Sequence, residues 1–151
     1  SLRLYAPGSF FYVVFTLLPV SKEEIKIFEG TMAKKTPEQK AAEERRYIAA
    51  CGAANAQELE PFLTDPNQAI RATAAMNPDA DAEILERFAK DRFWGVRIEV
   101  IRNANVSDAT LRGLLEANLP KRGVVHHAAR EKLEERGVAF GADGTPLDAA
   151  S

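Results

Sequence analysis

The chain of 151 residues lacks the features that mark several large classes of protein. It has one cysteine, Cys51, so no disulfide can form within the chain, which fits a reducing compartment. Its net charge of −2 provides no general attraction to nucleic acid or to an anionic membrane. The apolar run over residues 10–20 holds only eleven residues. A membrane-spanning helix needs about 20, so we expect none here.

Patterns that indicate catalysis or metal binding are also missing. The sequence has no glycine-rich phosphate loop, no paired-carboxylate motif and no Ser-His-Asp arrangement. His126 and His127 point about 100° apart on a helix and cannot easily share a metal ion, and only the pair His127 and Glu131 could offer two ligands. We expect the histidines to cap a helix or to act as surface pH-sensitive groups. We expect Cys51 to be buried and inert. The prediction is a non-enzymatic protein without cofactor or metal.

Residues 1–31 differ from the rest of the chain and allow three interpretations. The apolar run resembles the hydrophobic part of a secretory signal, although no cleavage-site pattern follows it. It could instead be a buried strand or a membrane-surface anchor. The third interpretation, which we favour, is that the natural protein starts at Met32, because Glu29 and Gly30 require purine-rich codons that resemble a bacterial ribosome-binding site read through in frame. The protein is then bacterial, cytoplasmic and free of the membrane; it is secreted or anchored only if residues 1–31 are genuine.

The feature that organises the chain is a repeat of 26 residues, present three times between residues 39 and 116. A basic set, an apolar set and a set of helix N-cap residues recur at this spacing. They are Arg45, Arg71 and Arg97; Leu59, Leu85 and Leu111; and Asn55, Asp81 and Ser107. A fixed period of this length is typical of stacked helical repeats. Helices this short must bury an apolar stripe against the next copy.

Each copy predicts two short helices. In the second copy we expect Asp65 to cap and Pro66 to open the first helix, which ends at Asn77. Asp81 should cap the second helix.

Further helices are predicted at both ends of the repeats. Thr36 and Gln39 form a capping box for a helix over residues 36–52. A charged helix over residues 121–136 should close the C-terminal end. Residues 32–137 then make one helical repeat domain, and residues 138–151 a flexible tail.

Two copies carry a longer motif. The third has Asp91, Trp94, Val96 and Arg97 in the order Asp-x-x-Trp-x-Val-Arg, and the second has an Ala-x-Asn-Pro string that ends at Pro78. These strings resemble the leucine-rich repeat variant (LRV) family. The period of 26 is slightly longer than that family's usual unit, and the other two copies lack Asn-Pro. The resemblance implies a right-handed superhelix akin to HEAT and armadillo stacks, and no catalytic residues.

We therefore predict an all-α fold, a short right-handed α-solenoid of about three and a half two-helix repeats. The predicted function is a scaffold that binds another protein, because a solenoid offers an extended, rigid surface. Two alternatives stay open: a HEAT-like nucleic-acid-binding module, and a structural or self-associating repeat unit.

The candidate binding residues are Arg45, Arg71, Arg97, Phe93 and Trp94. The arginines could form a basic stripe for an acidic partner or a phosphate backbone. We favour a structural role, in which the guanidinium groups pair with Asp65, Asp91 or a helix C-terminal carbonyl. Phe93 and Trp94 could be exposed hot spots, but we favour packing between the repeats, as the family's consensus tryptophan would pack.

Overall fold

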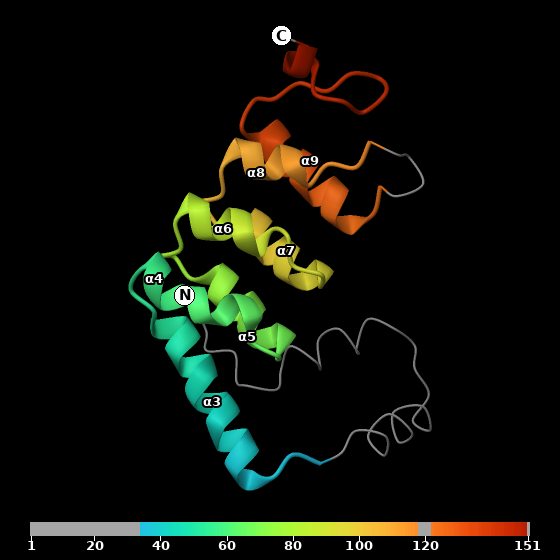
Figure 1. Ribbon diagram of the computed structural model, residues 1–151. Coiled ribbons are helices and arrows are strands. Elements are labelled where there is room, and N and C mark those ends of the chain that lie inside the picture. The colour runs from blue at the N-terminus through green and yellow to red at the C-terminus, as the bar shows by residue number, and fades with distance from the viewer. Residues whose placement is uncertain (1–33, 118–121, 151) are drawn as a thin grey trace, which may run out of the picture. The chain divides into compact units, whose positions relative to one another are not determined.

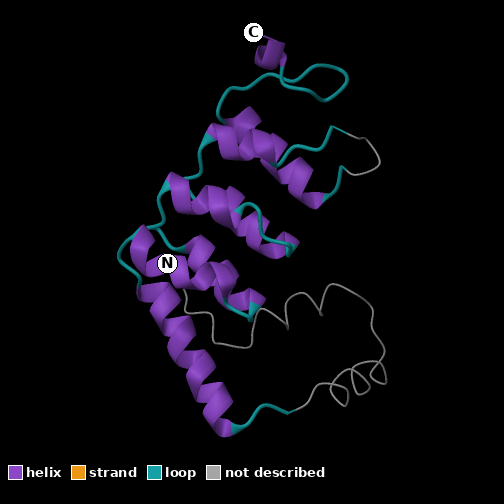
Figure 2. Ribbon diagram, viewed as in Figure 1, coloured by secondary structure: helices purple, strands orange, loops and turns teal. Residues whose placement is uncertain are grey.

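The computed structural model describes residues 34–117 and 122–150 and divides into two compact units, Ser1–Ala49 and Ala50–Ser151. Within the described ranges the chain is helical (Figure 2). The one β-type pairing in these ranges is an isolated bridge between Phe140 and Pro146. The all-α prediction is therefore confirmed. No helix in these ranges is long and apolar enough to cross a membrane. The extension predicted over residues 1–31 lies outside the described residues.

The helix α3 (Pro37–Gly52) begins in the first unit and opens with the predicted capping box. The Thr36 hydroxyl accepts a hydrogen bond from the Gln39 N–H at 3.2 Å, and the Gln39 side chain accepts one from the Thr36 N–H at 2.9 Å. Pro37 occupies the first helical position, where a missing N–H costs nothing. Lys35 and Glu43 form an ion pair of 2.6 Å across the first turns.

The second unit contains the repeats, and its helices follow one another in chain order (Figure 1). They are α4 (Ala56–Leu59), η1 (Glu60–Thr64), α5 (Gln68–Met76), α6 (Ala82–Phe88), α7 (Trp94–Arg102), α8 (Asp108–Gly113), α9 (Val124–Glu135) and η3 (Leu147–Ala150). From α5 to α7 the starting residue advances by 26 positions, but from α7 to α9 it advances by 30. The sequence period therefore holds through α8 and is broken before α9.

The helix starts confirm one set of predicted caps and correct another. Asn55, Asp81 and Ser107 each accept a hydrogen bond from the N–H three residues ahead, at 3.0, 2.9 and 3.1 Å. Asp65 does not cap α5, because that helix begins at Gln68 with Asn67 as its N-cap. Instead, the Asp65 carboxylate accepts from the Asn67 N–H at 2.8 Å, in a turn that precedes the helix.

The core of the second unit consists of the apolar residues that recur with the period. Leu59, Leu85 and Leu111 are fully buried. Phe62 and Phe88, each three residues after a leucine of this set, are also buried. The first helices of successive copies pack on each other, α5 on α7 and α7 on α9. Small side chains such as Ala75 keep the α5 surface close to its neighbours.

Two buried asparagines, Asn77 and Asn103, connect each copy to the one before it; we call them the asparagine bridges. The Asn77 Nδ2 donates to the carbonyls of Ala50 at 3.0 Å and Ala53 at 2.9 Å. The Asn103 Nδ2 donates to the carbonyls of Ala75 and Asn77, both at 2.9 Å. Carbonyls at a helix end have no partner in their own helix, so each bridge satisfies groups that packing would otherwise leave unpaired.

The first copy has Cys51 at the position of the asparagine bridges. We expected this cysteine to be buried, and that expectation is wrong, since Cys51 is exposed.

After α9 the chain returns to α8. Gly137, with φ of +90°, ends the helix, and the Val138 N–H bonds to the Leu133 carbonyl at 3.0 Å. Arg112 holds Asp148 through two hydrogen bonds of 2.8 Å, and this contact lowers the pKa of that carboxyl. The flexibility predicted for residues 138–151 stays a prediction.

Replacing a bridge should destabilise the second unit. We expect Asn77→Ala to lower the free energy of unfolding by about 1–3 kcal/mol, because buried carbonyls lose their donor. Urea denaturation measures this loss. Gln57→Ala, an exposed position on α4, is the control and should change stability by less than about 0.5 kcal/mol. Equal effects of the two substitutions would contradict the role of the bridge.

Candidate binding surface

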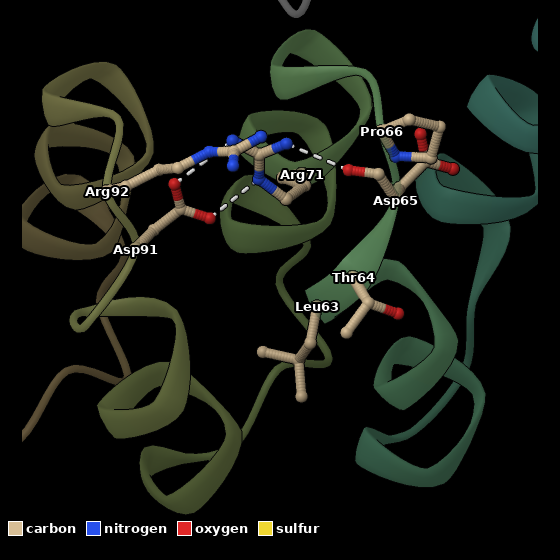
Figure 3. Close-up of a pocket in the computed structure, with 7 residues that line it drawn as sticks. All are labelled: Leu63, Thr64, Asp65, Pro66, Arg71, Asp91 and Arg92. Atoms are coloured by element: carbon tan, nitrogen blue, oxygen red, sulfur yellow. Dashed lines mark hydrogen bonds and ion pairs between the residues drawn. The ribbon is translucent and has the colours of Figure 1, made fainter.

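Arg71 on α5 connects two consecutive copies. Its Nε and Nη2 donate to the two carboxylate oxygens of Asp91 at 2.7 and 3.2 Å, and its Nη1 donates to the Asp65 carbonyl at 2.8 Å (Figure 3). Only 5% of the Arg71 side chain and 7% of the Asp91 side chain are exposed. A two-point contact of this kind is the strongest geometry between an arginine and a carboxylate. The structural role that we favoured is therefore confirmed for Arg71.

Arg97 occupies the same place on α7 but makes only one of these three hydrogen bonds with the described residues. Its Nη1 donates to the Asp91 carbonyl at 2.5 Å, which matches the bond from Arg71 to Asp65. The position that would match Asp91 in the next copy is Ala117, which has no carboxylate. Arg97 is half-buried and forms no ion pair with the described residues.

Arg45 lies on α3 within the first unit and is exposed. The three arginines therefore share a sequence position but differ in their surroundings. Arg71 is enclosed, Arg97 is half-buried and Arg45 faces solvent. An exposed basic stripe of equivalent residues, the first interpretation above, does not describe Arg71.

Phe93 and Trp94 differ sharply in exposure. Phe93 is half-buried and its ring lies 5.7 Å from that of Trp94. A Cβ on Gly95 would come within 2.5 Å of the Phe93 ring, so Phe93 packs over the bare backbone of that glycine. Trp94, at the start of α7, is 44% exposed. Packing therefore describes Phe93, whereas Trp94 presents much of its indole to solvent.

A shallow hollow lies beside Arg71 and is lined by Asp65, Asp91 and Arg92, among others (Figure 3). Arg92 points toward the guanidinium of Arg71 in this view. The two arginines are matched by two aspartates, and the donors of Arg71 are already used. The hollow therefore has no excess of either charge with which to attract an ion.

The sequence did not single out Glu99, which is buried on α7. Only 6% of its side chain is exposed, and it accepts from Arg102 at 3.1 Å. Burial raises the pKa of this carboxyl, and Arg102 opposes that effect. Its position between Ile98 and Val100 in an apolar segment was the available signal.

His126 on α9 is buried, with 2% of its surface exposed, whereas His127 is exposed. The His126 Nδ1 accepts a hydrogen bond from the N–H of Glu116, which lies in the loop after α8, at 2.9 Å. Burial lowers the pKa of His126, and Arg122, His127 and Arg130 act in the same direction while Glu116 opposes them. His126 therefore connects α9 to this loop and caps neither helix, since the N-cap of α9 is Gly123.

The inner face of α9 also differs from the expectation. The sequence predicts an inner stripe of Val124, Val125, Ala128, Ala129 and Leu133. The helix buries Ala129 and Leu133 of this stripe, together with His126, a spacing of three and four. Val124 is 58% exposed. Within the described ranges, no three His, Cys, Asp or Glu side chains gather in a way that could hold a metal ion.

Comparisons of the chain with protein-family models, with curated proteins and with solved structures found no match. The resemblance to the leucine-rich repeat variant family therefore stays an expectation from the residues that carry it. The function has to be argued from the geometry of the described residues.

Arg71 and Arg97 should differ in their contribution to stability. Arg71→Met keeps the apolar stem but leaves the Asp91 carboxylate buried without a cation, so we expect a loss of about 3–5 kcal/mol. Arg97→Met removes a single hydrogen bond and should cost about 1 kcal/mol. Chemical denaturation of the two variants measures both values. Equal losses would show that the contact with Asp91 does not distinguish the two arginines.

Stability should fall in acid because of His126. Its pKa in the folded protein lies below the ordinary value of 6.5, so the unfolded chain takes up the proton first. The contribution is fully present above about pH 6.5 and is lost as pH falls through the folded pKa. Protonation also removes the acceptor for the Glu116 N–H.

The test compares unfolding midpoints of three proteins from about pH 7.5 to 5.5, the range in which histidines titrate. His126→Asn, which keeps an acceptor but does not titrate, should flatten the pH dependence. His127→Asn, at the neighbouring exposed position, should keep most of the wild-type pH dependence, because burial is the largest cause of the lowered pKa of His126. A profile that follows His127 instead would refute the assignment.

Proposed function

We propose that the chain is a short right-handed α-solenoid of about three and a half two-helix repeats that binds another protein without catalysing a reaction. The support for the architecture is the matched start of α5 and α7, the three N-caps with the same bond, and the asparagine bridges between copies. Stacked repeats of this kind bury their shared stripe and leave a rigid surface free for recognition.

The observation that carries the binding proposal is the exposure of Trp94. Tryptophan is the largest apolar side chain, and 44% of this one lies in contact with water at a helix start. Phe93 packs over Gly95 and holds the backbone that presents the indole. A rigidly presented tryptophan is typical of a binding hot spot, since it loses little entropy on association.

The nucleic-acid alternative loses support from the surroundings of the arginines. That alternative needs several arginines whose donors are free for phosphates. Arg71 donates hydrogen bonds to the Asp91 carboxylate and to the Asp65 carbonyl, and Arg97 donates one to the Asp91 carbonyl. Recognition through an exposed aromatic side chain accounts better for this surface.

The test uses peptides selected from a random-sequence displayed library against the wild-type protein. Trp94→Ala should weaken the selected peptides about thirtyfold, the size of a hot-spot loss of about 2 kcal/mol. Fluorescence anisotropy measures the affinity, and a thermal melt of the same variant should stay near that of the wild type.

Two variants provide the controls. Met76→Ala removes another exposed apolar side chain, 49% exposed, from the adjacent helix α5 and should leave peptide binding unchanged. Phe93→Ala should instead lower the melting temperature, because that ring packs over Gly95. If Trp94→Ala destabilises the protein and binds peptides as tightly as the wild type, Trp94 is a packing residue and the proposal fails.

Sedimentation at several protein concentrations distinguishes self-association from binding to a different protein. A dimer that Trp94→Ala abolishes would show that the partner at this surface is a second copy of the chain. A monomer at every concentration is the expected result for a surface that recognises a different protein.

A further inference from the structure

Part of the Arg97 guanidinium is accessible and has no partner in the part of the chain that the structure describes. Of its donors, only Nη1 forms a hydrogen bond with the described residues, to the Asp91 carbonyl. No buried side-chain nitrogen or oxygen of the described, non-exposed residues lacks a hydrogen-bond partner. Neither Nε nor Nη2 of Arg97 bonds to the described residues, and neither is among the buried atoms without a partner, so both are accessible. These two atoms form the edge that Arg71 uses to hold the two oxygens of Asp91.

Residues 34–117 and 122–150 do not fill this edge. Ala117 stands where the period would place the next aspartate, and the turn before it is built differently. In the second copy the Lys90 N–H bonds back to Arg87 at 3.2 Å, whereas the matching Glu116 N–H is taken by His126. The backbone at this point is therefore directed to α9, and the described residues bring no carboxylate to Arg97.

Trp94 and Arg97 lie three residues apart on α7 and are therefore neighbours on its surface. The indole is 44% exposed, and the open guanidinium edge belongs to a half-buried side chain. A ligand that places a carboxylate against Arg97 would bring its adjoining group toward the indole. The two side chains together offer a charged contact and an apolar contact within one turn of helix.

We propose that Arg97 and Trp94 form a recognition site for a protein segment in which an aspartate or glutamate lies next to an apolar or aromatic residue. This inference rests on the proposed function and names the chemistry of the partner. The same guanidinium edge on Arg71 holds a carboxylate at two points in this very chain, which favours a carboxylate as the ligand. The net charge of −2 adds no general attraction for a polyanion such as nucleic acid.

The test applies the peptides selected from the library against the wild-type protein. We expect them to share an acidic residue beside an apolar one. Arg97→Met should weaken their binding about tenfold, as the loss of a charged two-point hydrogen bond predicts. Arg97→Lys keeps the charge but not the planar edge, so most of the loss should remain. Thermal melts of both variants confirm that they are folded.

Arg92→Met is the matched control, since it removes the same charge from an exposed position two residues before Trp94. It should leave affinity within about twofold of the wild type, as expected for an exposed charge. An equal loss in Arg92→Met and Arg97→Met would overturn the inference, because the effect would then be a general one of charge.

The remaining outcomes separate this inference from the proposed function. Peptides that depend on Trp94 but carry no acidic residue, or that bind Arg97→Met as well as wild type, overturn the inference and leave the proposed function standing. If no peptide depends on Trp94, both fail. A duplex DNA oligonucleotide is the second probe, and salt-sensitive binding that requires Arg97 would assign the edge to phosphate and refute the carboxylate.

Discussion

Buried side-chain donors that reach back to the main-chain carbonyls of the preceding copy are the interaction on which the second unit depends. The Asn77 and Asn103 amides join the end of one copy to the next. Leucines supply the burial but are not directional, so they do not by themselves define how one copy sits on another. Hydrogen bonds in a dry interior are directional and costly to lose. They therefore set the register of the stack.

The third copy shows what happens where this pattern stops. Ala117 replaces the aspartate, and His126 takes the Glu116 N–H. Arg136, the residue that follows α9, donates to the Val106 carbonyl at 2.8 Å. Val106 lies one period after Ala80, whose carbonyl accepts from Asn105. The need for a donor at this carbonyl persists while the residue that meets it changes. A different side chain thus meets the same need, and the Nε and Nη2 of Arg97 are left without a partner among the described residues.

The proposed binding surface lies where the chain departs from its own repeat. Residues that keep the period, such as Leu85 and Arg71, are buried and have structural partners. Trp94 and the contacts of Arg97 depart from it. The second copy has Gln68 at the position of Trp94, and there Asp91 accepts from the Nε and Nη2 of Arg71, the atoms that stay without a partner among the described residues in Arg97. Recognition by a repeat protein needs such differences, because identical copies would offer identical surfaces.

The sequence alone was sufficient for the helical class, the period, the three N-caps and the capping box at Thr36, because each depends on residues close together in the chain. It also indicated the pairing of Arg71 with aspartate, since the period placed an acidic residue within reach. It misplaced the starts of α5 and α9 and the exposure of Cys51, which depend on neighbouring elements. Only the tertiary structure decided that Asp91 provides the carboxylate for Arg71 and Asp65 the carbonyl. It also decided that His126 is buried, and that Trp94 faces solvent while Phe93 packs over Gly95. The physical reason is that exposure and long-range hydrogen bonds are set by which surfaces meet, and residues 20 or more positions apart meet only after the copies have stacked.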